Sequence, residues 1–336
     1  MEYRPLGRTG LKVSALCLGT MTFGSRFLNI ATVPQKSADD MVRRARDAGI
    51  NFFDTADVYS RGESEEILGK ALKNAGMDRD EAIVATKVRG TMSDTDPNAA
   101  GLSRKHVMAA CDASLRRLGT DHIDLYQVHG WDRLTPMDET LRALDDLVSS
   151  GKIRYAGCSN WPARHIARAQ ALAECGQWPG FVSLQAYYSL AGRDLEHELL
   201  PLCREQDLAV LPWSPLSGGF LTGKFRRDAT APADTRRAGF DFPPIDRERG
   251  FDAVDAAEAI GKEIGASIAQ VSLAWLLAQS GVTSVIIGAK RMDQLEDNLQ
   301  AADINLTDAQ IERLSQTTAP ATLYPQWMVE RQNSDR

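Results

Sequence analysis

The sequence predicts a (β/α)8 barrel. Eight short apolar segments recur along the chain, and amphipathic helical patterns lie between them. Short strands without polar alternation are typical of parallel sheets whose two faces are both covered by helices. Eight strands, each followed by a helix, give the element count of this barrel. The fold typically needs about 250 residues, and the 336 residues of this chain leave room for insertions.

The predicted strands are residues 16–19, 51–54, 83–87, 123–127, 153–157, 181–185, 208–212 and 284–288. The predicted helices are residues 37–49, 65–76, 104–119, 139–151, 163–176, 195–207, 252–264 and 268–280. We expect Ser37 to cap the first helix, and several helices end in glycine, as helices often do. Two irregular inserts, 89–103 and 218–244, interrupt this rhythm. The longer one is predicted to be a lid or a binding loop.

Other folds and site types fit the motifs less well. A doubly wound nucleotide-binding fold usually shows GxGxxG after its first strand, whereas this chain has GTMTFG at 19–24. The GxSxG motif that is typical of serine hydrolases does not occur in the sequence. Four of the five histidines fall in or beside helical segments, so we expect no metal site.

The composition of the chain bears on the classes of partner that it can bind and on its cellular compartment. The net charge is −6 and no run of lysine and arginine occurs, so we expect neither nucleic acid nor an anionic membrane surface as a partner. The N-terminus lacks the pattern of a secretory signal, and no apolar run approaches membrane-spanning length. Five dispersed cysteines suit a reducing cytoplasm.

Polar residues stand at the ends of the predicted strands. Active sites of such barrels are built at the carboxyl ends of the strands. These residues are therefore expected to converge, although each alone has an ordinary structural explanation. They are Asp54, Lys87, His129, Ser159, Asn160, Gln185, Trp213 and Ser214, with Tyr59 in the loop after Asp54. The acids Glu63, Glu65 and Glu66 are instead attributed to the dipole of a helix N-terminus.

Four of these residues form a coherent acid–base set. A phenol titrates near pH 10, and a neighbouring ammonium lowers its pKa, so Lys87 is expected to activate Tyr59. Asp54 would hold Lys87 charged and in place. His129 and Tyr59 would donate to an oxygen that gains negative charge. Such a site suits a carbonyl that receives hydride, with the proton supplied by Tyr59.

The chain resembles the aldo-keto reductase family, and the resemblance runs from the N-terminus to about residue 317. It rests on NFFDTADVYS, IVATKV, LYQVHGWD, GKIRYAGCSNW and IIGAKRMDQLEDNL. The segment PWSPLSGGFLTGKF, residues 212–225, is similar to the branch that includes bacterial reductases and the β-subunits of potassium channels.

The resemblance implies one domain over residues 1–336. It comprises a β-hairpin at 2–13 that plugs the barrel base, a barrel over about 14–303, and a C-terminal helix and tail at 304–336. It also implies NADPH bound without a Rossmann motif, with small-molecule carbonyl or alcohol substrates. The catalytic set of the family falls on Asp54, Tyr59, Lys87 and His129.

The same resemblance assigns residues to the cofactor. Ser159, Asn160 and Gln185 are expected at the nicotinamide carboxamide, and Trp213 at the nicotinamide ring. The pyrophosphate is assigned to Ser214, Pro215, Leu216, Ser217, Gly218 and Lys224, and the adenosine end to Gly288, Lys290, Gln294, Asp297 and Asn298. Gly19, Thr20, Met21 and Asp54 complete the expected contacts.

One position departs from the family pattern. Many relatives carry an arginine where Gln294 stands, and that arginine grips the 2′-phosphate. Here Lys290, with Arg291, is expected to supply the positive charge. Lysine binds phosphate as a point charge rather than as a fork.

The substrate pocket is expected to be aromatic and mostly apolar, which suits aldehydes and bulky ketones. Its predicted wall consists of Phe23, Tyr59, His129 and Trp131, with the tail residues Tyr324, Trp327 and Met328 as further candidates. Oxidation of a secondary alcohol with NADP⁺ uses the same residues. A redox-sensing regulatory subunit that binds NADPH and turns over slowly is the main alternative, and a non-redox barrel enzyme such as an isomerase is a third.

Overall fold

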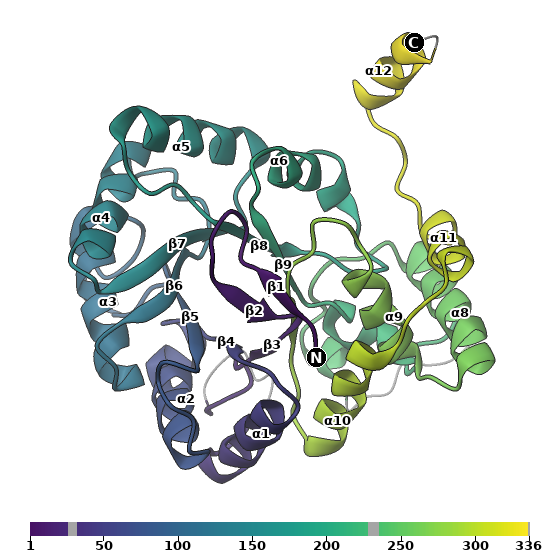
Figure 1. The fold of residues 1–336 in the computed structure, drawn as a ribbon, viewed down its shortest axis with the longest axis horizontal. Helices are drawn as coiled ribbons and strands as arrows, with labels where there is room; N and C mark the ends of the chain where they lie inside the picture. The colour runs from purple at the N-terminus through teal and green to yellow at the C-terminus, as the bar shows by residue number, and fades with distance from the viewer. Residues whose placement is uncertain (26–31, 228–234, 335–336) are drawn as a thin grey trace.

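The computed structural model describes residues 1–25, 32–227 and 235–334. Its centre is an eight-stranded parallel sheet with the strand order β10-β3-β4-β5-β6-β7-β8-β9. A bridge between Val210 and Val282 brings β9 beside the start of β10, so the sheet curls into a nearly closed barrel inside a ring of helices (Figure 1). The predicted (β/α)8 barrel is therefore confirmed.

The barrel strands are β3 (Leu16–Gly19), β4 (Phe52–Asp54), β5 (Ile83–Val88), β6 (Ile123–Val128), β7 (Ile153–Ser159), β8 (Ser183–Tyr187), β9 (Ala209–Trp213) and β10 (Val285–Ile287). The α-helices are α1 (Gln35–Asp47), α2 (Glu63–Asn74), α3 (Arg104–Leu118), α4 (Met137–Ser149), α5 (Ala163–Gly176), α6 (Leu199–Glu205), α7 (Arg236–Gly239), α8 (Arg247–Ile264), α9 (Ile268–Leu277), α10 (Met292–Gln300), α11 (Asp308–Thr317) and α12 (Gln326–Asn333). Short 3₁₀ segments are η1 (Tyr59–Gly62), η2 (Asp194–Glu196), η3 (Ser217–Thr222) and η4 (Ala301–Asp303).

Several helix boundaries differ from the prediction: α2, α4 and α8 begin at Glu63, Met137 and Arg247 rather than at residues 65, 139 and 252. Helix α1 begins at Gln35 after Pro34, and Ser37 lies inside its first turn rather than at its cap. Proline at this position supplies an extended backbone and ends the preceding segment without a side-chain cap. The helix predicted at 195–207 is split into η2 and the shorter α6.

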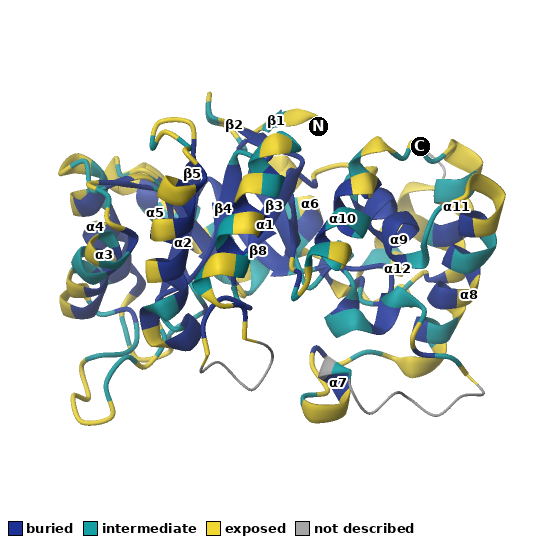
Figure 2. Ribbon diagram, turned by 90° about the horizontal axis from the view of Figure 1, so that it is seen from below, coloured by how far each residue is buried: buried dark blue, intermediate teal, exposed yellow. Residues whose placement is uncertain are grey.

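The half of the barrel interior next to the N-terminal hairpin is apolar. Alternate residues of the strands point inward, and they pack with the hairpin formed by β1 (Tyr3–Pro5) and β2 (Lys12–Ser14). Figure 2 shows this hairpin at one end of the barrel, opposite the end where α7 lies. The inner cluster comprises Leu6, Val13, Cys17, Phe52, Ile83, Ala85, Leu125, Val182, Ala209, Leu211 and Ile286. The hairpin expected at residues 2–13 is therefore present as a plug.

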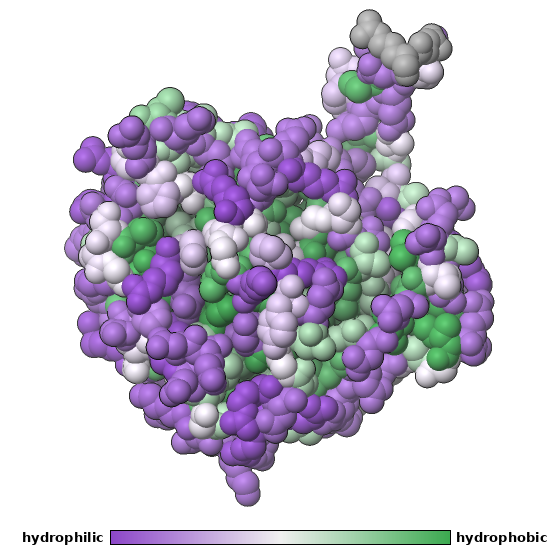
Figure 3. All heavy atoms as spheres, viewed as in Figure 1, coloured by the Kyte–Doolittle hydropathy of each residue, from purple (hydrophilic) through white to green (hydrophobic). Residues whose placement is uncertain are grey.

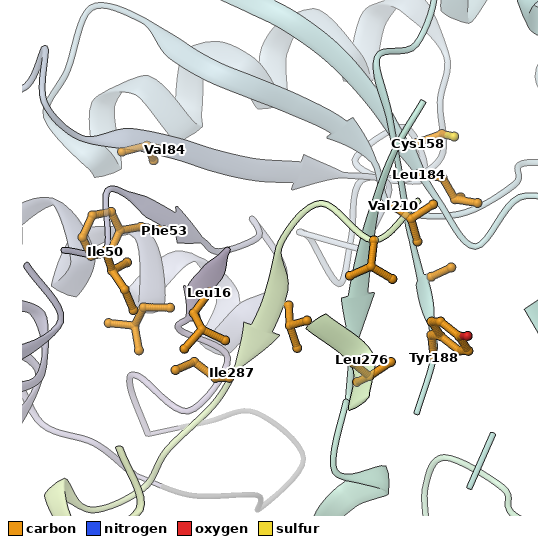
Figure 4. Packing of buried hydrophobic residues seen from close by; sticks show 14 of the residues in the cluster. Leu16, Ile50, Phe53, Val84, Cys158, Leu184, Tyr188, Val210, Leu276 and Ile287 are labelled. Carbon is orange, nitrogen blue, oxygen red and sulfur yellow. The ribbon is translucent and has the colours of Figure 1, made fainter. Parts of the chain in front are cut away.

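The second core lies between the strands and the helices. The residues that alternate with the inner set, such as Leu16, Phe53 and Val84, face outward into this layer (Figure 4). All three are fully or almost fully buried. Burial on both faces explains why the strands read as continuous apolar runs.

The irregular insert at 218–244 begins with η3 and includes α7, while its residues 228–234 lie outside the described part of the chain. Arg237 ties this insert to the end of β9, because its guanidinium donates to Ser217 O at 2.8 Å and to Pro243 O at 3.0 Å.

The C-terminal helix α12 stands apart from the ring of helices (Figure 1). The face that carries the hairpin is largely hydrophilic (Figure 3). None of the helices in the described residues has both the length and the apolar character needed to cross a membrane.

Candidate active site

The residues predicted to be catalytic lie at the strand ends, on the side of the apolar cluster away from the hairpin. On β4 the inward position after Phe52 is Asp54, and on β5 the inward position after Ala85 is Lys87. The same parity on β6 leads from Leu125 to a glutamine, Gln127. A strand alternates its side chains with period two, so the sequence itself places these polar groups inside the barrel.

Lys87 is the centre of the site. Its side chain is fully buried, and its ammonium donates to Asp54 Oδ1 at 2.6 Å, to Thr55 O at 2.8 Å and to Tyr59 Oη at 3.3 Å. Burial alone would lower the pKa of Lys87, but the charge of Asp54 and the bond to Tyr59 outweigh it and raise that pKa. The lysine is therefore a permanent cation beside the phenol.

The other oxygen of Asp54 accepts two amide hydrogen bonds. Gln185 Nε2 lies 2.8 Å from Asp54 Oδ2 and Gln127 Nε2 lies 3.2 Å from it. Gln185 Nε2 also lies 3.3 Å from Gln127 Oε1. Gln127 was not among the predicted site residues, although its inward parity after Leu125 was available as a signal. It belongs to the set because it shares Asp54 with Lys87.

Tyr59 is held by an unusual turn. Ser60, Arg61 and Gly62 follow it with φ values of 49°, 55° and 95°. Left-handed conformations cost energy for residues other than glycine, and they persist where surrounding contacts enforce them. The guanidinium of Arg61 supplies such a contact through two bonds to Asp94, of 2.9 and 2.7 Å. The turn directs the phenol back over the end of β5.

The expected lowering of the Tyr59 pKa is outweighed. Burial raises the pKa of Tyr59, and the nearby charge of Lys87 offsets this increase in part. The prediction from the sequence considered the ammonium and omitted the desolvation of a phenol that is 8% exposed. Tyr59 consequently keeps its proton at neutral pH, as a general acid must.

His129 lies at the end of β6 beside the phenol. The two ring centroids are 5.8 Å apart and the rings meet edge to face at 79°. Burial, Lys87 and Arg89 lower the pKa of His129 to about 3. The imidazole is therefore neutral near pH 7, which fits a hydrogen-bond donor rather than a second acid.

Glu65 does not follow the prediction of a solvated acid at a helix N-terminus. It is fully buried, and its carboxylate accepts from Thr86 Oγ1 and from Arg117 Nε, each at 2.6 Å. It thus fastens α2 to β5 and α3 directly behind Lys87. Burial raises the pKa of the neighbouring Asp57 to about 8, so this carboxyl adds no full charge near Lys87 at neutral pH.

The residues assigned to nicotinamide gather at the ends of β7, β8 and β9. Trp213 Nε1 donates to Asn160 Oδ1 at 3.1 Å, and Asn160 Nδ2 lies 3.0 Å from Ser159 Oγ. The ring of Trp213 is parallel to that of Phe242 within 8°, with centroids 5.8 Å apart. Together with Gln185, these side chains offer donors and acceptors next to an aromatic face.

The segment assigned to the pyrophosphate follows β9. Ser214 and Ser217 have φ values of 51° and 50°, and the Ser214 hydroxyl accepts from Gly218 N at 3.0 Å. A Cβ on Gly218 would lie 2.5 Å from Phe242 O, so glycine permits the close approach of the insert. Lys224 is exposed further along, and Pro215 and Leu216 complete the turn.

The residues assigned to the adenosine end surround the start of α10. Gln294 Oε1 accepts from Lys290 N at 2.9 Å, and Asn298 Nδ2 donates to Gly288 O at 3.3 Å. Asp297 differs from the others, because its carboxylate accepts from Ser267 Oγ and Gln270 Nε2 at the cap of α9. Its structural role is thus to join α10 to α9.

Most of the residues at the turn after β3 that were assigned to cofactor or substrate are buried by protein contacts. Phe23 is 1% exposed and packs in the outer core, so it has no surface to offer a pocket. Thr20 is fully buried, and its hydroxyl is bonded to Asp54 O at 3.1 Å and Ser64 Oγ at 2.9 Å. A Cβ at Gly19 would lie 2.7 Å from Ile286, which explains the glycine by strand packing. Met21 is half-buried beside them.

Of the remaining residues predicted to line the substrate pocket, Trp131 lies near the site, whereas the C-terminal tail does not. Trp131 is half-buried near His129, with one face stacked on His165 at a centroid distance of 4.1 Å. Tyr324 and Trp327 are 74% and 44% exposed, and α12 lies outside the helical ring (Figure 1). The expectation that the tail forms a pocket wall is therefore not met in this structure.

Clustered metal ligands are lacking in the described part of the chain. In residues 1–25, 32–227 and 235–334, no group of three or more histidine, cysteine, aspartate or glutamate side chains is arranged to hold a metal ion. The site instead combines one buried ion pair, one phenol and one neutral imidazole.

Comparison with known proteins agrees with this arrangement. Three similar proteins cover nearly the whole chain. An uncharacterized oxidoreductase, YrpG, of Bacillus subtilis is 41% identical over 94% of both chains. Versiconal hemiacetal acetate reductase of Aspergillus parasiticus is 35% identical over 97% of this chain and 99% of its own. A probable voltage-gated potassium channel subunit beta of Oryza sativa is 37% identical over 90% and 92%.

The family model of the aldo/keto reductases matches residues 15–319, which include every barrel strand and all four catalytic candidates. The match covers most of the chain and agrees with both the barrel and the polar layer at its strand ends. The chain therefore belongs to the aldo/keto reductase family, whose members are oxidoreductases that act on carbonyl compounds.

Proposed function

We propose that this protein reduces aldehydes and ketones to alcohols with NADPH, in a reversible reaction that also oxidises secondary alcohols with NADP⁺. One observation carries the proposal: Tyr59 Oη lies 3.3 Å from Lys87 Nζ, which lies 2.6 Å from Asp54 Oδ1. A phenol that touches a fixed, buried cation can release its proton to a substrate oxygen and remain stabilised as phenolate.

The roles follow from the contacts. A nicotinamide cofactor, once bound, would supply hydride to the carbonyl carbon. Tyr59 donates the proton to the carbonyl oxygen, and neutral His129 donates a hydrogen bond to the same oxygen. Lys87 stabilises the resulting phenolate, while Asp54 holds the lysine in position. Donors fixed in this way need little reorganisation during the reaction.

The side chains present fit a dinucleotide. Gln185 uses its Nε2 on Asp54 and Gln127, which assigns its Oε1 to the carboxamide, with Ser159 and Asn160 beside it. At the adenosine end, Arg291 is paired with Asp293 by two bonds of 2.9 and 2.8 Å. We assign the 2′-phosphate to Lys290 with Arg291, because both cations lie at the start of α10 beside Gln294, and a positive charge there favours NADPH over NADH.

The setting of the proposal is a single domain over residues 1–336 in the cytoplasm, acting on small molecules. Its support is the net charge of −6 and the five free cysteines, of which Cys175 is exposed and Cys17, Cys111, Cys158 and Cys203 are buried. An acidic protein is a poor match for nucleic acid or an anionic membrane.

A regulatory subunit is the second candidate. It is favoured by the 37% identity to the potassium channel subunit beta of rice. Such a protein would bind NADPH tightly and turn over slowly. Steady-state turnover with a reactive aldehyde separates the two, because a reductase completes many cycles while a sensor stops near one.

The test is NADPH oxidation with a panel from 4-nitrobenzaldehyde to bulky cyclic ketones, with NADH in parallel. Tyr59→Phe should retain NADPH binding and lose about 10²- to 10⁴-fold in kcat. Tyr324→Phe, the same change in an exposed tail residue, should leave kcat unchanged. Because burial raises the pKa of Tyr59, turnover by the parent should stay level through neutral pH and fall on the alkaline side. Parental turnover by Tyr59→Phe would remove Tyr59 as the acid.

A further inference from the structure

An exposed arginine lies beside the catalytic histidine. Arg89 follows β5 two residues after Lys87, with a φ of 153° that side-chain-bearing residues rarely adopt. Its carbonyl accepts from Gly101 N at 3.0 Å, and its Nε donates to Trp131 O at 3.2 Å. Contacts on both its backbone and its side chain thus hold this arginine in place.

The stem of Arg89 crosses the chain next to His129. A Cβ placed on Gly130 would lie 3.3 Å from Arg89 Cδ and 3.5 Å from its Nε. Gly130 separates His129 from Trp131, the two residues expected to contact substrate on this side. The guanidinium is therefore fixed at the rim of the site, one residue from the proposed oxyanion donor.

No carboxylate among the described residues forms an ion pair with this guanidinium. Asp132, which follows Trp131 in the loop after β6, has its oxygens engaged by other donors: Oδ1 accepts from Leu134 N, and Oδ2 accepts from Leu102 N and Thr135 Oγ1. Lys87 is neutralised by Asp54. The exposed guanidinium of Arg89 donates through Nε to Trp131 O and lowers the pKa of Asp132, but it forms no ion pair with a carboxylate of the described residues. A free guanidinium edge of this kind matches a carboxylate in a planar, bidentate fashion.

The charge of Arg89 affects the pKa of His129. Burial, then Lys87 and then Arg89 lower the pKa of His129, so the arginine is close enough to disfavour a second cation there. An anionic group that enters beside His129 would be attracted by the charge of Arg89. Trp131 lies beside the arginine, with its ring stacked on His165 and edge to face with Trp161. The tryptophan is only half-buried, so its remaining surface is available to an aromatic substrate body next to the guanidinium.

We propose that Arg89 is a specificity-determining residue, and that the preferred substrates are aromatic aldehydes or ketones that carry a carboxylate. The inference rests on the proposed reductase function and names the substrate class of that same site. Arg89 contacts the carboxylate of the substrate, while Tyr59 and His129 contact its carbonyl oxygen.

The experiment compares 3- and 4-carboxybenzaldehyde with their methyl esters, which keep the aldehyde and lose the charge. In the parent, kcat/KM should favour at least one acid over its ester. In Arg89→Met that preference should fall tenfold or more, through KM rather than kcat, and Arg89→Lys should restore part of it. Arg133→Met removes an exposed arginine from the neighbouring loop, after β6, and should change the preference less than twofold. An unchanged preference in Arg89→Met would overturn the inference while the reductase function stood.

A binding measurement keeps the inference testable without turnover. Calorimetric titration of the NADPH-loaded protein with benzoate and with benzamide compares a carboxylate with a neutral amide. The parent should bind benzoate at least tenfold more tightly, and Arg89→Met should bind the two alike. Equal affinities in the parent would overturn the role of Arg89. If benzoate is preferred but no carbonyl compound is reduced, the proposed reductase function fails and the anion site remains.

Discussion

The two halves of the barrel interior are built by the same strands, two residues apart, and they have opposite chemistry. Toward the hairpin, inward positions such as Phe52 and Leu125 are apolar and fully buried. Toward the other end, the next inward positions are Asp54 and Gln127, and on β5 Lys87. Two residues along a strand span about 6–7 Å, so an ion pair rests directly on a hydrophobic floor.

The contrast explains how a buried charge pair is tolerated. Removing an ammonium and a carboxylate from water costs several kcal/mol per ion, and the apolar half supplies burial energy without needing polar partners. The polar half satisfies Asp54 with Lys87, Gln127 and Gln185. The apolar half thus stabilises the fold. This stability offsets the cost of burying Asp54 and Lys87 in the polar half, where Lys87 lies beside Tyr59.

The largest effect is expected from breaking the pair. Lys87→Met should reduce kcat by about 10³-fold, because Tyr59 loses the cation that stabilises its phenolate. It should also lower the free energy of unfolding by roughly 3–5 kcal/mol, since Asp54 stays buried without its partner. Steady-state kinetics and urea unfolding measure the two losses. Lys70→Met, at an exposed lysine of α2, is the matched control.

Adding Asp54→Asn to Lys87→Met separates the two consequences. The double variant removes both charges, so stability should return while turnover remains lost. If turnover returned together with stability, the ion pair would be a structural element and the assigned chemistry would be wrong.

The next effect concerns the apolar floor. Phe52→Ala should lower the free energy of unfolding by about 3 kcal/mol, because it opens a cavity under Asp54 where no side chain can collapse easily. At a temperature well below the unfolding midpoint, KM for aldehyde should stay within about twofold of the parent. A large rise in KM without loss of stability would show that the two halves are not separable.

Much of this organisation could be predicted from the sequence, and the omissions have physical causes. Asp54, Lys87 and His129 were found because strand ends of a parallel barrel converge. Gln127 was missed because an amide inside an apolar strand looks unremarkable until its partner Asp54 is known. Glu65 was misassigned because proximity to a helix N-terminus gives no information on burial, which depends on Arg117, 52 residues away in the chain.

Long-range packing also explains why Phe23, the C-terminal tail and the pKa of Tyr59 differ from the predictions. Phe23 follows the first strand, where many barrels have a pocket wall, but it is buried by the outer core. The aromatic tail near Trp327 lacks any local signal for where it lies, and the structure places it outside the ring of helices (Figure 1). The net pKa of Tyr59 depended on its burial, which no neighbour in the sequence indicates.

The smallest effect tests the residue that sequence reasoning omitted. Gln127→Leu removes one donor from the Asp54 carboxylate and leaves Lys87 and Gln185 in place. A hydrogen bond to a charged group is worth about 1.5–3 kcal/mol, so Asp54 should hold Lys87 less firmly and kcat should fall roughly tenfold. KM for aldehyde should not change, because Gln127 is fully buried and is bonded to Asp54 and Gln185. Leu125→Met, one inward position below, keeps an apolar side chain and should leave kcat unaltered. Equal losses of stability in both variants with an unaltered kcat would mean that Gln127 contributes to packing alone, and the functional part of the polar half would then be limited to the ion pair and Tyr59.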